Sequence, residues 1–230
     1  MTDFHSHILP KMDDGSRSTE ESIAMLKSLF VQGVNRVIAT PHFYANDESV
    51  SSFLSRRRAS FESLAVSAPS SEMPEILQGA EVRYYDGISR LADLKSLCIQ
   101  GTRLLLLEMP ETKWTEYTLR ELTDISSDGK VTLVLAHVER YMGFQKSDTF
   151  YRLLCNGILM QINAGFVNGF FSRRKAIGLL KKNEVHFLGS DCHNMADRAP
   201  NIGKAFDIIK NKLGEDFTES FKSYTNEFFK

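Results

Sequence analysis

The sequence has little of what marks secreted or membrane proteins. It has only three cysteines, at positions 98, 155 and 192. Because their number is odd and they lie far apart in the sequence, they do not form a disulfide framework. They favour a reducing compartment, so we expect a cytoplasmic protein. No run approaches about 18 uninterrupted apolar residues, and the first residues lack a basic segment followed by an apolar one. We therefore expect neither export nor membrane insertion.

The sequence also lacks an excess of charge of either sign. Its 28 lysines and arginines against 29 aspartates and glutamates give a net charge of −1, which argues against a strongly basic nucleic-acid-binding protein and a basic peripheral membrane protein. The densest basic runs, residues 56–58 and 173–175, lie in helical patterns and indicate either a solvated helix face or a docking surface for an acidic partner. The sequence leaves the oligomeric state open.

What is present is the composition of a globular protein, with 42% hydrophobic and 25% charged residues, and no linker that would divide a single domain over residues 1–230. Seven short apolar runs predict strands at Thr2–His7, Arg36–Thr40, Ile76–Val82, Leu104–Met109, Thr132–His137, Leu159–Asn163 and Val185–Gly189. Segments with helical periodicity are Ser18–Val31, Val50–Ala65, Asp86–Leu97, Glu116–Ile125, Asp148–Cys155, Ser172–Lys182, Ile202–Leu213 and Asp216–Phe228.

This alternation of strands and helices predicts the fold class. Strand–helix repetition is typical of parallel strands joined by right-handed crossovers. Seven units with nearly uniformly apolar strands favour a closed α/β barrel, and an open doubly wound sheet is the alternative.

Side chains that can bind metals lie at the ends of six of the seven predicted strands. His5 and His7, for example, lie two residues apart on the first strand and share a face. In parallel α/β folds the functional groups lie at the carboxyl ends of the strands, and at this edge of the sheet the groups are close to one another. The candidates gathered by this rule are His5, His7, Asp14, His42, Glu81, Glu108, His137, Asp191 and His193.

Taken together, these nine side chains predict a metal centre, although each alone could be a surface or capping residue. Buried carboxylates and imidazoles that converge without a counter-charge would be costly, so cations are expected among them. Nitrogen and oxygen ligands favour Mn²⁺, Fe²⁺, Co²⁺ or Zn²⁺, and nine ligands suit two or three ions. The sixth histidine, His186, lies inside a predicted strand and is expected to be a packed residue.

The charge of such a centre indicates an anionic substrate. Four carboxylates with three divalent ions leave about +2, and ions about 3.5–4 Å apart hold phosphate oxygens while a hydroxide attacks phosphorus. Arg140 and Arg198 follow His137 and His193 closely in the sequence. They are placed to bind a phosphoryl group, with a surface ion pair as the alternative for each.

Seven short motifs give the chain a resemblance to a known family. They are Asp3–Pro10 (DFHSHILP), Asp13–Ser16 (DDGS), Ala39–His42 (ATPH), Gly79–Glu81 (GAE), Leu107–Pro110 (LEMP), Ala136–Tyr141 (AHVERY) and Ser190–Asn194 (SDCHN). From residue 2 to about residue 210 the chain resembles the bacterial capsule-type tyrosine phosphatases of the polymerase and histidinol phosphatase (PHP) superfamily. The Asp-Asp-Gly and His-x-Glu-Arg motifs separate this subfamily from histidinol phosphatases.

The resemblance implies a distorted parallel (β/α)7 TIM-like barrel of PHP type. Its expected activity is a protein-tyrosine phosphatase that uses three divalent ions, usually manganese, and a hydroxide that bridges them. The expected partner is the phosphotyrosine tail of a bacterial tyrosine autokinase that regulates capsule or exopolysaccharide synthesis.

The resemblance also assigns roles to individual residues. The first ion would be held by His5, His7, Glu81 and Asp191, the second by Glu81, Glu108 and His137, and the third by Asp14, His42 and His193. Arg140 and Arg198 match the phosphate-binding arginines and, with His42, are the catalytic candidates. Asp13 and Glu139 would orient ligands.

The chain departs from the family pattern at two places. Phe43 stands where many members carry a basic residue directly after His42, so contacts with the substrate in that loop are expected to differ. The C-terminal residues Phe228, Phe229 and Lys230 also end the chain earlier than is usual.

Three other functions fit parts of the sequence. Cys192 and Arg198 have the Cys-x5-Arg spacing of cysteine-dependent tyrosine phosphatases, but the intervening segment has no glycine and carries Asp197 where a phosphate would sit. The same metals would also serve a phosphoesterase for a small metabolite such as histidinol phosphate. A non-catalytic regulator that binds the kinase is disfavoured because no ligand position is degraded.

Overall fold

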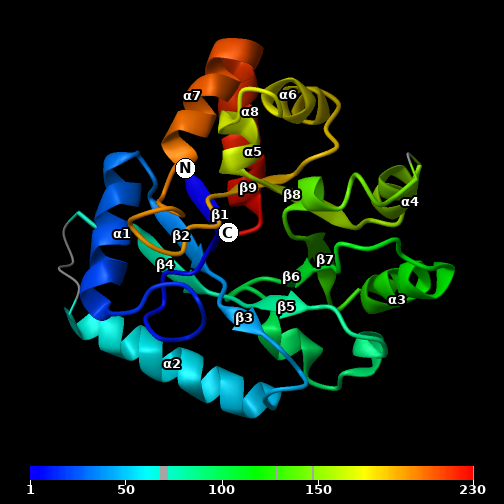
Figure 1. Cartoon of the computed structure of the whole chain (residues 1–230), viewed down its shortest axis with the longest axis horizontal. Coiled ribbons are helices and arrows are strands. Elements are labelled where there is room, and N and C mark those ends of the chain that lie inside the picture. Colours follow the sequence, from blue (N-terminus) through cyan, green and yellow to red (C-terminus); the bar gives the residue numbers. More distant parts are fainter. Residues whose placement is uncertain (68–71, 128, 147, 230) are drawn as a thin grey trace.

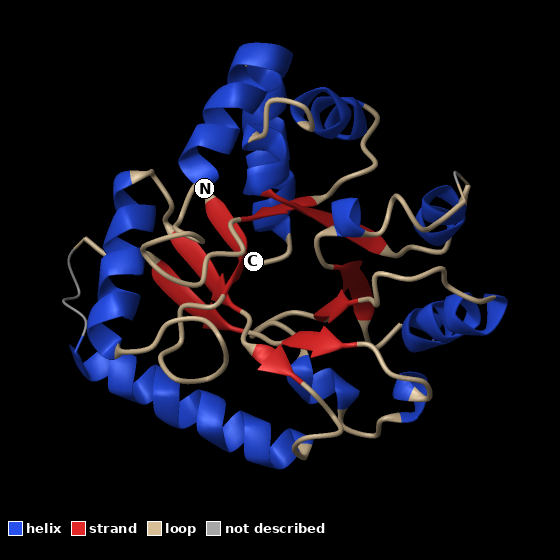
Figure 2. Ribbon diagram, viewed as in Figure 1, coloured by secondary structure: helices blue, strands red, loops and turns tan. Residues whose placement is uncertain are grey.

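The computed structural model describes residues 1–67, 72–127, 129–146 and 148–229, and in it short parallel strands lie at the centre with helices around them (Figures 1 and 2). The strands are β1 Thr2–Ser6, β2 Arg36–Ala39, β3 His42–Phe43, β4 Glu75–Gln78, β5 Glu81–Arg83, β6 Leu104–Glu108, β7 Thr132–Leu135, β8 Leu159–Asn163 and β9 Phe187–Gly189. The α-helices are α1 Thr19–Val31, α2 Val50–Ser67, α3 Glu116–Ser127, α4 Thr149–Cys155, α5 Ala164–Asn168, α6 Arg173–Lys181, α7 Ile202–Leu213 and α8 Glu215–Glu227. Three 3₁₀ helices are η1 Ile88–Arg90, η2 Leu94–Leu97 and η3 Val138–Arg140.

The strands form two parallel sheets that meet at β1 and β9. One sheet has the order β1-β2-β4 and the other the order β3-β5-β6-β7-β8-β9. A bridge between Ser6 and Cys192 links the sheets, and there the amide of His7 donates to the carbonyl of Cys192 at 2.9 Å. The predicted α/β class with parallel strands is confirmed. Because the carboxyl ends of parallel strands share one edge, the candidate site lies at that edge.

One predicted strand is divided and one further strand, β3, was not predicted, so the described residues contain nine strands and the count of seven units stays a prediction. The predicted strand Arg36–Thr40 is followed by Pro41, which has no amide proton for the ladder, and β3 begins directly after it. The predicted strand Ile76–Val82 breaks into β4 and β5, and these pair with β2 and β3 in turn.

The prediction of an α-helix over Asp86–Leu97 is wrong. This segment forms η1 and η2 instead, and Gly87 before η1 has a φ of +93°, which a continuous right-handed helix does not allow. The helix α5 was not predicted, because its five residues are too short to show helical periodicity.

A small apolar cluster supports the candidate site from within the sheets. Its buried members are Phe4, Ile38, Ile99, Leu104, Leu106, Val134, Ala136 and Phe187, and the rings of Phe4 and Phe187 stack at 3.9 Å. Leu106 lies two residues before Glu108 on β6, so both share one face of the strand. Phe228 and Phe229 pack against this cluster. The last described residues therefore contribute to the core.

His186 is a packed residue, as predicted. It precedes β9, and its Nδ1 accepts a hydrogen bond from the amide of Met160 at 3.1 Å. Its ring packs near Phe187 and Tyr224. Burial lowers the pKa of His186 to about 4, because the charged imidazolium is poorly solvated there.

We expect His186 to make stability depend on pH. Between the unfolded pKa of about 6.5 and the folded pKa of about 4, the unfolded chain binds more protons, so the free energy of unfolding falls as the pH falls through that window. The loss should be on the order of 1–3 kcal/mol. Urea unfolding at pH 7 and pH 4.5 should show a smaller loss for His186→Gln than for the parent chain. An equal loss in both would contradict this role of His186.

Candidate metal centre

Glu81, the first residue of β5, lies at the centre of a cluster of imidazoles. Its Oε2 is 3.2 Å from Nε2 of both His5 and His7 and 3.1 Å from Nδ1 of His42. Its Oε1 is 2.8 Å from Nε2 of His137. Burial alone would raise the pKa of Glu81, but the surrounding imidazoles hold this pKa well below its ordinary value. One carboxylate thus faces four histidines.

A second part of the cluster surrounds Asp14, in the loop that follows β1. Its Oδ1 lies 3.4 Å from Nε2 of His193 and 3.6 Å from Nε2 of His42. The loop approaches closely because Gly15 packs against His7, where a Cβ atom would lie 2.4 Å from the carbonyl oxygen. Only glycine fits the third position of this Asp-Asp-Gly motif.

Asp191 and Glu108 complete the cluster from the ends of β9 and β6. The Oδ1 atom of Asp191 lies 3.7 Å from Nε2 of His5 and 3.6 Å from that of His7. Glu108 Oε1 lies 3.8 Å from Nε2 of His137. The structure therefore brings together all nine residues that were predicted from the strand ends.

Seven of the nine residues form three overlapping groups, and within each group the candidate ligand atoms lie within 4.8 Å of one another. These groups are His7 with Asp14, His42 and His193; His5 with His7 and Glu81; and His42 with Glu81 and Glu108. They differ from the sets that the family resemblance implies. His7 joins the Asp14 group, His42 takes the place of His137 with Glu81 and Glu108, and Asp191 is absent from the group of His5, His7 and Glu81.

Four of the five histidines are tethered in the same way. The Nδ1 atom of each lies close to an oxygen that is not a candidate ligand atom. This oxygen is Gln161 Oε1 for His5 (3.3 Å), Asp13 Oδ2 for His7 (2.7 Å), the Tyr141 hydroxyl for His137 (3.0 Å) and the backbone carbonyl of Asp191 for His193 (3.0 Å). An Nδ1 proton donated outward leaves Nε2 unprotonated and aimed inward. This arrangement is typical of histidines that bind metal ions.

Several inward atoms have no hydrogen-bond partner in the described part of the chain. They are Glu81 Oε2, His42 Nδ1 and His193 Nε2, all buried. Burial lowers the pKa of His193 to about 4, which keeps its imidazole neutral and able to coordinate a cation. Because unpaired buried polar atoms are costly, their convergence fits divalent cations bound among them.

Backbone strain marks two of the candidate ligands. His137 has a φ of +30° and Asp191 a φ of +53°, and both lie just after their strands, β7 and β9. Such left-handed conformations cost on the order of 1–3 kcal/mol each in non-glycine residues. At both positions this backbone directs the side chain toward the cluster.

Of the two residues predicted to orient ligands, Asp13 contacts residues of the cluster, and Glu139 contacts Asn163 behind it. Asp13 Oδ2 holds His7 and also accepts the amide proton of His42 at 2.8 Å, and His7 keeps the pKa of this buried carboxyl below its ordinary value. Glu139 Oε1 accepts the amide proton of Asn163 at 3.1 Å, and burial raises the pKa of Glu139 to about 7. Asp13 therefore contacts candidate ligands directly, whereas Glu139 is connected to Asp191 only through Asn163.

The two predicted phosphate-binding arginines bind the same carboxylate. Nη2 of Arg140 lies 2.6 Å from Oδ2 of Asp191, and Nη2 of Arg198 lies 2.9 Å from Oδ1. Burial alone would raise the pKa of Asp191, but His5, His7 and the Arg198 guanidinium hold it below its ordinary value. Asp191 therefore places both guanidinium groups on one side of the cluster.

Sequence reasoning missed three polar residues behind the cluster. Gln161 Oε1 accepts the amide proton of His137 at 2.7 Å, and the side-chain amide of Asn163 donates to Asp191 at 2.8 Å. Gln161 and Asn163 lie two apart on β8, so alternation along that strand is a signal that could have found them. Tyr141 fixes His137 and also accepts from the amide of Met109.

Arg83 is a further guanidinium at the site that the sequence analysis did not identify. It lies two residues after Glu81 on β5, and its Nη1 is 2.7 Å from Oε2 of Glu108. Phe43, which stands in place of the expected basic residue, is buried and packs edge-on against Phe53. The neighbouring Tyr44 lies partly exposed with its ring 5.4 Å from that of His42.

Cys192 does not fit the alternative of a cysteine-dependent phosphatase. It is fully buried, and burial raises the pKa of its thiol far above the ordinary value, so no thiolate forms near neutral pH. We expect Cys192→Ala to keep kcat/KM close to that of the parent chain while lowering the free energy of unfolding by about 1 kcal/mol. Phosphatase assays and urea unfolding test this. Loss of activity in a folded variant would favour the cysteine mechanism.

Comparison with known proteins agrees with this geometry. The family model described as "Capsular polysaccharide synthesis, CpsB/CapC" matches residues 1–227. The chain belongs to the CpsB/CapC family. Among curated relatives of the family, tyrosine-protein phosphatase YwqE of Bacillus subtilis is 29% identical over 94% of this chain and 86% of its own length. Tyrosine-protein phosphatase CpsB of Streptococcus pneumoniae is 30% identical over 93% of this chain and 91% of its own length.

Solved structures of this family have the same fold. A structure from the work on YwqE of B. subtilis and CpsB of S. pneumoniae, described as unique metal-dependent tyrosine phosphatases, superposes with a TM-score of 0.82 and 25% identity. It covers 99% of this chain and 94% of that chain. A phosphotriesterase homology protein of Escherichia coli, 12% identical with a TM-score of 0.57, shares the fold alone.

The predicted family is thus confirmed, and the predicted enzyme class is confirmed at the level of the CpsB/CapC family. The number and kind of metal ions, the autokinase substrate and the roles of individual residues stay predictions. None of the helices in the described part of the chain is long and apolar enough to cross a membrane.

Proposed function

We propose that this CpsB/CapC chain is a metal-dependent protein-tyrosine phosphatase. Its substrate is a phosphotyrosine in the tail of a bacterial tyrosine autokinase that regulates capsular or exopolysaccharide synthesis. The observation that supports it most is the common tethering of four imidazoles, whose Nε2 atoms converge on Glu81, Asp14 and Asp191 beside two arginines. The family's name and those of its relatives favour phosphotyrosine and capsule synthesis.

The nine clustered residues fit a site for three divalent ions, with Mn²⁺ as the proposed ion. When bound, such ions would supply positive charge next to the phosphoryl group and would lower the pKa of a coordinated water, which is the chemistry that hydrolysis of a phosphate ester by hydroxide requires. We place His5, His7, Glu81 and Asp191 at the first ion, Glu81, Glu108 and His137 at the second, and Asp14, His42 and His193 at the third. Glu81 is shared because its two oxygens face different histidines.

The residues of the chain itself position the substrate and stabilise the transition state. Arg140 and Arg198, held together by Asp191, bind equatorial oxygens of the phosphoryl group as negative charge develops there. Asp13 holds His7 and the backbone of His42 in place. A phenolate leaves with less help from an acid than an alkoxide does, so the proposed reaction needs no strong general acid.

The openness of the site favours a tyrosine on a protein over a small metabolite. The Asp14 side chain is 64% exposed and that of Arg198 is 37% exposed, so the phosphate-binding side lies at the surface. A phosphotyrosine that projects from a polypeptide reaches such a site, whereas enclosure of a whole metabolite requires a deeper pocket.

Turnover of two substrates by the same manganese-loaded protein tests this proposal. We expect kcat/KM for a phosphotyrosine peptide to exceed that for histidinol phosphate. A higher kcat/KM for histidinol phosphate would replace the proposal with a small-molecule phosphoesterase. Binding of the peptide without release of phosphate would instead indicate a non-catalytic regulator.

A further inference from the structure

Two adjacent phenylalanines project into solvent between α5 and α6. Phe170 is 81% exposed and Phe171 is 94% exposed, and their rings meet edge to face with centroids 5.3 Å apart. Single exposed apolar residues are common. Two neighbouring aromatic rings that bury almost none of their surface instead indicate a site of contact with a membrane or with another molecule. Neither ring takes part in the metal centre.

The turn that carries these rings is firmly built. Ser172 donates from its hydroxyl to the carbonyl of Phe166 at 2.6 Å, and the Arg173 guanidinium donates to the carbonyl of Asn168 at 2.9 Å. Gly169 has no room for a side chain, since a Cβ atom would lie 2.3 Å from the Ser172 hydroxyl. These contacts hold Phe170 and Phe171 outward, so their exposure is not the result of a loose loop.

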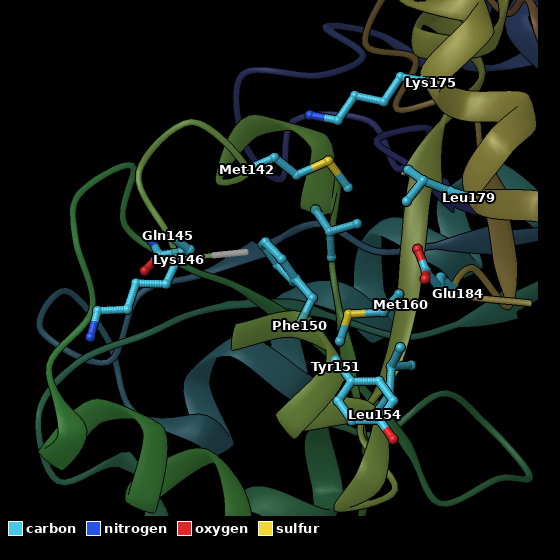
Figure 3. A pocket seen from close by; sticks show the side chains of 11 residues that line it. Met142, Gln145, Lys146, Phe150, Tyr151, Leu154, Met160, Lys175, Leu179 and Glu184 are labelled. Atoms are coloured by element: carbon cyan, nitrogen blue, oxygen red, sulfur yellow. The ribbon is translucent and has the colours of Figure 1, made fainter. Parts of the chain in front are cut away.

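The charge around the turn is of one sign. Residues 157–183 contain five lysines and arginines and no aspartate or glutamate, although the whole chain has a net charge of −1. Arg174 and Lys175, directly after the turn, are exposed, and neither forms an ion pair with a described residue. Figure 3 shows Lys175 extending from α6 at the rim of an apolar cavity, apart from Glu184. The turn therefore attracts an anionic partner.

The turn lies at the same edge of the fold as the metal centre. It follows α5, and α5 begins directly after Asn163, whose side chain binds Asp191. In Figure 1, α5 lies beside β8 and β9, and α6 lies at the outer side of the molecule. A partner bound at the turn would thus lie near the mouth of the metal centre.

We propose that residues 169–175 bind the surface of an anionic lipid bilayer. A projecting pair of rings flanked by cations suits a bilayer, because the rings enter the boundary between headgroups and acyl chains while Arg174 and Lys175 remain among anionic headgroups. An extended acidic peptide would need a groove with walls around its side chains, and rings exposed by 81% and 94% provide none. Because the whole chain has a net charge of only −1, we expect this basic segment alone to contact the bilayer.

Sedimentation with vesicles tests the aromatic part of the contact. The full chain should bind vesicles of phosphatidylglycerol and phosphatidylcholine and should not bind vesicles of phosphatidylcholine alone. Phe170→Ser with Phe171→Ser should lower the partition coefficient by about tenfold or more. The matched control Val31→Ser with Val66→Ser removes two other highly exposed apolar side chains and should leave binding unchanged. Equal loss in both double variants would overturn the proposal.

Separate variants test the contribution of the basic residues to vesicle binding. Arg174→Glu with Lys175→Glu should abolish binding to the anionic vesicles, whereas Lys27→Glu with Lys204→Glu, at exposed lysines on α1 and α7, should not. Hydrolysis of a soluble phosphotyrosine peptide should be the same in all four variants, which shows that they are folded.

A higher KM for that peptide in the Phe170 and Phe171 variant, with vesicle binding retained, would identify a peptide-docking surface and overturn the proposal. Failure of the parent chain to bind anionic vesicles would also overturn it.

Discussion

Replacement of Glu81 by glutamine is expected to lower kcat/KM for a phosphotyrosine peptide by at least about 100-fold and to reduce the metal content of the chain. The glutamine side chain has nearly the same shape, but it carries no charge and only one acceptor oxygen. In the parent chain the two Glu81 oxygens face four imidazoles at 2.8–3.2 Å, so no other carboxylate can take its place. Metal analysis and steady-state kinetics on the same preparation measure both effects.

Glu121→Gln is the matched control, because Glu121 is also a buried carboxylate with several hydrogen bonds. It accepts from the Tyr84 hydroxyl at 2.8 Å and from the amide of Gly87, and it contacts none of the nine candidate ligands. This variant should lose about 1–3 kcal/mol of unfolding free energy while it keeps its metal ions and activity. If Glu81→Gln behaved in the same way, the metal centre would not lie at Glu81.

Replacement of Arg140 by alanine should lower kcat/KM by about 10²–10³-fold while the metal content stays unchanged. The guanidinium lies beside the cluster and binds Asp191 from outside it, so its loss removes charge stabilisation of the phosphoryl group without removing a ligand. The inhibition constant of inorganic phosphate should rise as well. Arg140→Lys should restore only part of the activity, because an ammonium group lacks the paired donors of a guanidinium.

Arg152→Ala provides the comparison for this prediction. Arg152 also forms an ion pair with a carboxylate, at 3.0 Å from Glu116, but at an exposed surface away from the cluster. Such pairs contribute at most about 1 kcal/mol, so activity and phosphate inhibition should match those of the parent chain. Loss of metal ions in Arg140→Ala would indicate that Arg140 holds Asp191 in place as a metal ligand. It would contradict a role of Arg140 in phosphate binding.

The sequence was sufficient to predict which residues meet at the site, because one rule of parallel sheets locates them. Each candidate ligand lies near the carboxyl end of a predicted strand or in the loop after it, and the carboxyl ends of parallel strands share an edge. His186, which precedes β9, was separated from the other five histidines by the same rule. The pattern needed only strand positions correct to within a residue or two, and that accuracy was enough.

The parts that could not be predicted depend on three-dimensional detail. The short strand β3 after Pro41 and the left-handed backbone at His137 depend on local backbone geometry, which the periodicity of apolar residues does not reveal. The tethers of the imidazoles are individual hydrogen bonds between distant segments, such as that of His5 with Gln161. Arg83 resembled an ordinary strand residue until its contact with Glu108 placed it at the site.

The most direct test of the account is the activity of the chain as a function of its bound metal. The protein would be stripped with a chelator, refilled stepwise with Mn²⁺, and assayed at each step for metal content per chain and for hydrolysis of a phosphotyrosine peptide. We expect no activity in the stripped protein and recovery in proportion to the bound metal, with no effect of iodoacetamide on the buried Cys192. Activity that survives complete removal of metal and is abolished by iodoacetamide would contradict it.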